Sequence, residues 1–241
     1  MLPGNFQVVN NGPGDQTDPH VDCDLVSYTD DDFSGVLRIR YFDVATSTDH
    51  AIPGNGADSL SDASGTRIAF TVATLDGPQV VVFETSTQQR TVIPGTHKNR
   101  PTLGGNLMAF QDGNFYAESA QSEISVYDLN TGTGTRLTND TLVDKLVAVS
   151  PTGNAMVWEK SQEDGSGGDI YAAIQTSPGV FSVTALTGAA GKEHNPDTNG
   201  EVVVYTSTRA GETDIFFTAH RRRPRNAARP SRRTARSKHL G

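Results

Sequence analysis

Five copies of one pattern occur along this chain, and the aromatic residues that close them are 42, 40, 48 and 47 residues apart. Each copy passes from a polar stretch through a turn rich in Gly, Asn or Asp into a short apolar run that ends in the aromatic residue. These residues are Tyr28, Phe70, Phe110, Trp158 and Tyr205. A repeat of this length is a unit that cannot bury its apolar face alone, so successive copies must stack against one another.

Each copy continues beyond its aromatic residue in the same way. A second β-rich run follows, at 37–44, 80–84, 123–129, 169–174 and 214–218. A tight turn comes next, as at 128–132, where Asn130 and Gly132 suit the positive φ of a hairpin. A further short run completes the copy, and no segment has the 3.6-residue apolar period of a helix. Four antiparallel strands in about 45 residues are typical of one blade of a β-propeller.

The predicted fold is therefore an all-β, five-bladed β-propeller with four-stranded antiparallel blades in one domain, residues 1–218. The expected blades cover residues 16–53, 56–95, 97–140, 142–191 and 192–218. The last copy lacks its outer strand, and residues 5–10 match the missing piece. The N-terminal strand is therefore expected to pair into the last blade and close the ring, which would leave no open sheet edge.

Two of the copies resemble the TolB-like repeat of bacteria, also called the WD40-like or PD40 repeat. The likeness rests on Val149-Ser-Pro-Thr-Gly153 leading to Trp158, and on Asn195-Pro196 leading through Gly200 to Tyr205, with Gly211 and Ile215 beyond. The resemblance extends over nearly all of residues 5–218 and implies a propeller blade, without implying a reaction. TolB itself has six blades and an added N-terminal α/β domain, whereas this sequence shows five copies.

Charge divides the chain into two parts. Residues 1–218 contain 11 Lys and Arg against all 28 Asp and Glu, which leaves a net charge of −17, whereas 221–238 contain nine Lys and Arg and no acid. An acidic body repels nucleic acid and anionic lipid, so we expect no nucleic-acid binding through the folded body. The apolar runs are too short to span a bilayer, so we expect no membrane insertion.

The basic tail, residues 219–241, allows three interpretations. It is an arm that binds nucleic acid or an acidic surface, a solvated disordered segment, or a frameshifted end where the blade pattern stops abruptly. The chain as written shows no signal peptide, so a periplasmic or secreted location is expected only if a signal has been removed, and a cytoplasmic one otherwise. The single cysteine, Cys23, excludes an internal disulfide framework.

Motifs for catalysis are absent: there is no nucleophile elbow, zinc helix, phosphate loop or dinucleotide fingerprint. We therefore predict no catalytic residue, metal site or cofactor. The alternative is a carbohydrate-active hydrolase of the five-bladed type that uses channel carboxylates. Asp18 would be its base, and Glu118, Glu123 or Glu159 would supply the second carboxyl group that such a reaction needs.

The favoured function is a non-catalytic binding scaffold. Its polar channel mouth would take a protein segment, a peptide or a small polar ligand such as a carbohydrate, because loops on a rigid scaffold commonly carry function. The connector before each inner strand should lie on this rim. The predicted rim residues are Asp18, His20, Asp58, Arg100, Lys145, His194 and Asn195.

Overall fold

A computed structural model describes residues 8–54, 56–113, 121–188, 190–209 and 211–219. These residues form 19 β-strands arranged in five antiparallel sheets. The described part of the chain has no helix long and apolar enough to cross a membrane. The basic tail beyond Ala219 lies outside the described residues, so its three interpretations stay open.

Each sheet is built from strands that are consecutive in the sequence. Sheet 1 contains β1 (Asp15–Asp22), β2 (Leu25–Asp31), β3 (Leu37–Asp43) and β4 (Thr48–Ala51). Sheet 2 contains β5 (Asp58–Ser64), β6 (Arg67–Val72), β7 (Gln79–Glu84) and β8 (Gln89–Val92). Sheet 3 contains β9 (Lys98–Gly104), β10 (Leu107–Asp112), β11 (Glu123–Asp128) and β12 (Thr133–Arg136). Sheet 4 contains β13 (Val143–Val149), β14 (Ala155–Ser161), β15 (Asp169–Ser177) and β16 (Val180–Ala185), and sheet 5 contains β17 (Glu193–Thr198), β18 (Val202–Ser207) and β19 (Asp214–Ala219).

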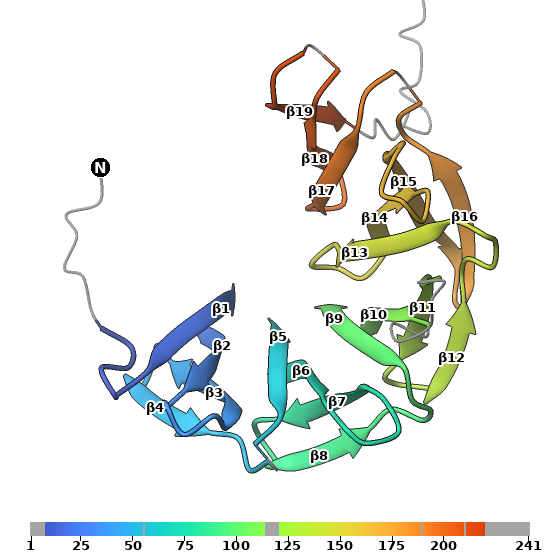
Figure 1. Ribbon diagram of the computed structural model, residues 1–241. Helices are drawn as coiled ribbons and strands as arrows, with labels where there is room; N and C mark the ends of the chain where they lie inside the picture. The colour runs from blue at the N-terminus through green and yellow to red at the C-terminus, as the bar shows by residue number, and fades with distance from the viewer. Residues whose placement is uncertain (1–7, 55, 114–120, 189, 210, 220–241) are drawn as a thin grey trace, which may run out of the picture.

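The five sheets follow one another around an arc, with the first strand of each sheet nearest the centre (Figure 1). These inner strands are β1, β5, β9, β13 and β17. The arrangement confirms the prediction of a five-bladed propeller. The last blade has three strands among the described residues, in the order β17-β18-β19.

One pair of positions recurs in every contact between successive sheets. We call the face that a sheet turns toward the next sheet its forward face, and the opposite face its rear face. The aromatic residue of the repeat lies on the rear face and packs against the preceding sheet, as Phe70 does against sheet 1 and Trp158 against sheet 3. The facing aliphatic residues, Ile39, Val80, Ile124 and Ile170, are completely buried. Burying a side chain of this size contributes about 1.5–3 kcal/mol, so the repeat itself stabilises the stack.

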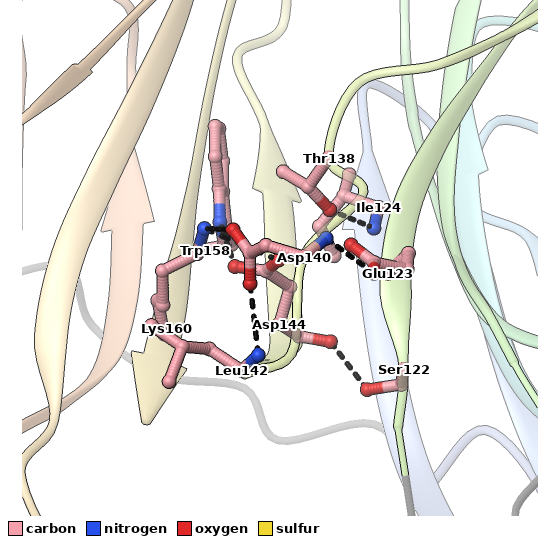
Figure 2. A network of polar contacts seen from close by, with 9 residues as sticks. All are labelled: Ser122, Glu123, Ile124, Thr138, Asp140, Leu142, Asp144, Trp158 and Lys160. Carbon is pink, nitrogen blue, oxygen red and sulfur yellow. Dashed lines mark hydrogen bonds and ion pairs between the residues drawn. The ribbon is translucent and has the colours of Figure 1, made fainter. Parts of the chain in front are cut away.

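Charged groups are also buried between the sheets, and Figure 2 shows the network between sheets 3 and 4. The indole Nε1 of Trp158 donates to Oδ1 of Asp144 at 2.7 Å, and Nζ of Lys160 lies 3.6 Å from Oδ2 of the same carboxylate. Burial raises the pKa of Asp144 to about 6. Because this pKa lies above its ordinary value, the contribution of Asp144 to stability is largest below about pH 4 and is lost as the pH rises through about 6. The network also fixes the orientation of Trp158 in the interface.

Every inner strand carries a β-bulge at the same place, where its pairing with the second strand shifts register. A residue with positive φ lies in each bulge: Asp18, Leu60, Arg100, Leu146 and Asn195. In sheets 1, 3 and 5 the next residue is proline, which has no N–H to donate and fits a strand only at an edge or a bulge. In sheets 1 to 4 these residues are turned toward the central channel.

The predicted ring closure falls largely outside the described residues, because 1–7 are not among them. Asn10 lies beside sheet 1, where its Nδ2 donates to Oδ1 of Asp30 at 3.3 Å. In the described part of the chain, β19 is the outer strand of sheet 5 and pairs with β18 alone. Closure by the N-terminal strand therefore stays a prediction.

The positive φ of Leu60, 56°, predicts how substitutions at this position change the stability of the protein. Asparagine adopts this left-handed region readily, whereas a β-branched residue does so only with strain. We expect Leu60→Val to lower the free energy of unfolding by about 1–2 kcal/mol more than Leu60→Asn does. Urea denaturation of the two variants measures the difference, and equal stability would show that this position does not need the left-handed conformation.

Candidate functional site

Three adjoining cavities follow the inner strands along the axis of the arc. The first has a volume of 260 Å³ and is lined by Arg100, Gln111, Lys145, Leu146, Glu159, Lys192 and His194. The second, of 210 Å³, is lined by Asp18, His20, Leu60, Ser61, Arg100, Pro101, Thr102, Leu146 and Val147. The third is the largest, at 530 Å³, and takes residues from all five inner strands, among them His20, Asp62, Thr102, Val147 and Asp197.

The three cavities form one channel, because neighbouring cavities share lining residues. Arg100 and Leu146 line both the first and the second, and His20, Thr102 and Val147 line both the second and the third. Along β9, Arg100 precedes Thr102, so the first cavity lies toward the N-terminal ends of the inner strands and the third toward their C-terminal ends. The two ends differ in charge.

The N-terminal end of the channel is basic. Arg100, Lys145 and Lys192 line the first cavity together with His194 and Glu159. Nζ of Lys145 lies 3.3 Å from Oε1 of Glu159, whereas no carboxylate of the described residues lies within ion-pair distance of Arg100 or Lys192. Residues 1–218 have only 11 Lys and Arg, and three of them meet here. This cavity can therefore attract an anion despite the acidic body around it.

The C-terminal end of the channel is acidic apart from one imidazole. His20 lies between two carboxylates, with Nδ1 3.4 Å from Oδ1 of Asp62 and Nε2 3.7 Å from Oδ1 of Asp18. Asp18 and Asp62 raise the pKa of His20 to about 10 against the opposing effect of burial. His20 is therefore a cation at neutral pH, and Asp22 and Asp197 add further negative charge to the third cavity.

Most of the residues predicted for the rim lie along this channel. Arg100, Lys145 and His194 line the first cavity, and Asp18 and His20 line the second with Arg100. Asn195 is exposed beside His194, with its Nδ2 3.1 Å from Nδ1 of the imidazole, and lines none of the three cavities.

Asp58 lies elsewhere, buried between sheets 1 and 2 with Nη1 of Arg90 3.6 Å from its Oδ2. Burial raises the pKa of Asp58 above its ordinary value. The residue of sheet 2 that occupies the place of Asp18 and Arg100 is Leu60, as its bulge and positive φ show. Asp58 is thus two residues away from the channel-facing position of its strand.

Lys192 was not predicted from the sequence. It precedes β17 by one residue and lines the first cavity beside His194. The signal that could have identified it is its charge, because it is a cation in a blade opening of a body that has few cations.

The carboxylates considered for catalysis have other partners where the structure describes them. Oε1 of Glu123 accepts the backbone N–H of Asp140 at 2.9 Å, Glu159 faces Lys145, and Glu118 lies outside the described residues. The described residues contain no group of three His, Cys, Asp or Glu side chains placed to hold a metal ion.

This chain resembles known proteins in structure and not in sequence. No protein-family model matches the chain, and no curated protein matches its sequence. TolB from Acinetobacter baumannii is 20% identical with a TM-score of 0.59 over 86% of this chain and 52% of its own, so this chain spans about half the length of that protein. A protein of Agrobacterium tumefaciens, provisionally assigned as TolB, is 15% identical with a TM-score of 0.63 over 89% and 80%.

Propellers of other proteins match as well. A prolyl endopeptidase is 13% identical with a TM-score of 0.62 over 90% of this chain and 35% of its own. A chain from the nidogen/laminin complex is 16% identical with a TM-score of 0.54 over 82% and 73%. Identities this low show the fold alone, and one fold carries many functions. This chain has the fold of the TolB-like propellers, as its repeats suggested.

The raised pKa of His20 predicts how the stability of the protein depends on pH. Because it lies above the ordinary value of 6.5, the stability that His20 contributes is fully present below pH 6.5 and is lost as the pH rises through about 10. We expect His20→Gln to have a flatter dependence of unfolding free energy on pH over this range than the unchanged chain. NMR titration of the His20 ring gives the pKa directly, and a midpoint near 6.5 would show that Asp18 and Asp62 do not hold the proton.

Proposed function

We propose that this protein is a non-catalytic binding scaffold whose channel takes an anionic ligand at its basic end, such as a carboxylate-bearing protein segment or small molecule. The observation that carries the proposal is the convergence of Arg100, Lys145 and Lys192 on one cavity of 260 Å³. Neither Arg100 nor Lys192 lies within ion-pair distance of a carboxylate of the described residues. A ligand carboxylate would supply the missing counter-charge.

The fold supports such a site physically. The cations are placed by the inner strands β9 and β13 and by the connector that leads into β17, so the sheets behind them hold their backbones in position. Charge-assisted hydrogen bonds to carboxylates are stronger than neutral ones, and more so where water is partly excluded. Little ordering would be required on binding, which favours affinity.

A structural neighbour from the nidogen/laminin complex comes from a protein–protein assembly, in keeping with a partner of protein origin. The hydrolase alternative has no comparable support, because Asp18 and Asp62 both face His20 and Glu159 faces Lys145. We therefore favour binding without chemistry.

The proposal predicts that removing the cations weakens anion binding. An array of acidic, neutral and basic peptides and of acidic and neutral glycans would supply the probes, and calorimetry would measure the affinity of those that bind. Each charged hydrogen bond that is lost should cost about 1.5–3 kcal/mol, so Arg100→Gln with Lys145→Gln should weaken an acidic probe by about a hundredfold or more.

The matched control is Arg38→Gln with Arg67→Gln, which removes the same charge from two cations that are paired outside the channel. This control should change affinity by much less than the channel pair. Equal losses in both double variants would mean that overall charge attracts the probe, and unchanged affinity in the channel pair would place the site elsewhere.

A further inference from the structure

The forward face of sheet 5 exposes three apolar side chains. Val204, Ile215 and Phe217 are exposed to 39%, 75% and 74%. They alternate along β18 and β19 with Val203, Tyr205 and Phe216, which turn the other way and pack on sheet 4. Sheet 5 is thus packed on its rear face and open on its forward face.

The repeat shows how unusual this exposure is within the molecule. Ile215 pairs with Thr206, the residue after the aromatic Tyr205, and the residues at this position in sheets 1 to 4 are Ile39, Val80, Ile124 and Ile170. All four are 0% exposed. The position of Phe217 holds Tyr41, Val82, Val126 and Ala172 in the other sheets, and all of these are buried. Sheet 5 therefore presents the same packing surface as the others, and no sheet formed by the described residues packs on it.

Sheet 1 of the same chain does not cover this surface. Its rear face is the complementary one, but Tyr28 and Phe42 on that face are already buried. Val9 and Asn10 lie over it and line a cavity of 160 Å³ with Val26 and Tyr28. Figure 1 shows sheets 1 and 5 at the two ends of the arc, not packed face to face as successive sheets are.

We propose that the forward face of sheet 5 binds the same face of a second copy of the chain. The residues that alternate onto this face from β18 and β19 carry no charge: Val202, Val204, Thr206, Ile215, Phe217 and Ala219. The inner strand β17 adds His194 and the exposed Asp197 to the same face, on its channel side. Two sheets pack face to face about 10 Å apart in β-sandwiches, and a two-fold axis lets one patch serve as its own partner. Within each chain a forward face packs on a rear face, whereas this contact would join two forward faces about the two-fold axis.

The size of the face predicts a reversible dimer. Three exposed side chains bury a few hundred Å² per copy, below the roughly 800 Å² per partner of a standard stable interface. The net charge of residues 1–218 predicts how dimerisation depends on salt. Because residues 1–218 carry −17, two copies repel each other, and salt should strengthen an apolar contact between them by screening this repulsion. Association through the basic tail and the acidic body would instead weaken with salt.

The test is the oligomeric state of the full chain by sedimentation velocity, from low micromolar to several hundred micromolar and at low and high salt. We expect a monomer–dimer equilibrium that high salt does not weaken. Ile215→Ser and Phe217→Ser should each raise the dissociation constant at least tenfold. Phe33→Ser is the matched control, because Phe33 is also 74% exposed but lies in a loop of sheet 1, and it should leave the equilibrium unchanged.

A cross-link identifies the face directly. In a Cys23→Ser background, Ile215→Cys would provide a single thiol, which should form a disulfide-linked dimer faster than the native Cys23 of the unchanged chain. A chain that stays monomeric throughout, or dimers that form equally well in all serine variants, would overturn the proposal. Monomers that Ile215→Ser strongly destabilises would also overturn it, because they would show that the chain covers this face itself.

Discussion

The packing of each sheet on the next, through one aliphatic and one aromatic position, is the interaction on which the rest of the structure depends. A sheet of three or four short strands is marginal in water and needs a partner for its apolar face. Here the partner is the following copy of the same unit. Ile39 of sheet 1 packs in one core with Phe70 of sheet 2, as Ile124 of sheet 3 does with Trp158 of sheet 4.

The channel is a consequence of the same stack. Every sheet carries its bulge at the same place, and the bulge residues of sheets 1 to 4 line the channel. The neighbouring residues set the charge at each end of the channel. Arg100 and Lys145 lie at one end, and His20 lies with Asp62 and Asp197 at the other. A chain with a strongly negative body thus keeps a basic cavity.

The fold could be predicted from the sequence because the pattern of one blade occurs five times along the chain. The aromatic residues and the turns occur at regular intervals. A copy that departs from the pattern can therefore be aligned with the other four. The channel was harder to predict. Sheet 2 lacks the proline that follows the bulge residue in sheets 1, 3 and 5, so Asp58 looked equivalent to Asp18, whereas Leu60 holds that place. The open face of sheet 5 could not be predicted either, because Ile215 has the same sequence context as its buried counterparts.

The most direct test of the stacking account is one substitution made at four equivalent places. Ile39, Ile124, Ile170 and Ile215 occupy the same position in four sheets, and the first three are completely buried. Measured by urea denaturation at low protein concentration, Ile39→Ala, Ile124→Ala and Ile170→Ala should each lower the free energy of unfolding by about 2–5 kcal/mol. Ile215→Ala should lower it by less than about 1 kcal/mol, as expected for an exposed site. Four equal losses would contradict the account, because they would mean that the stack does not end at sheet 5.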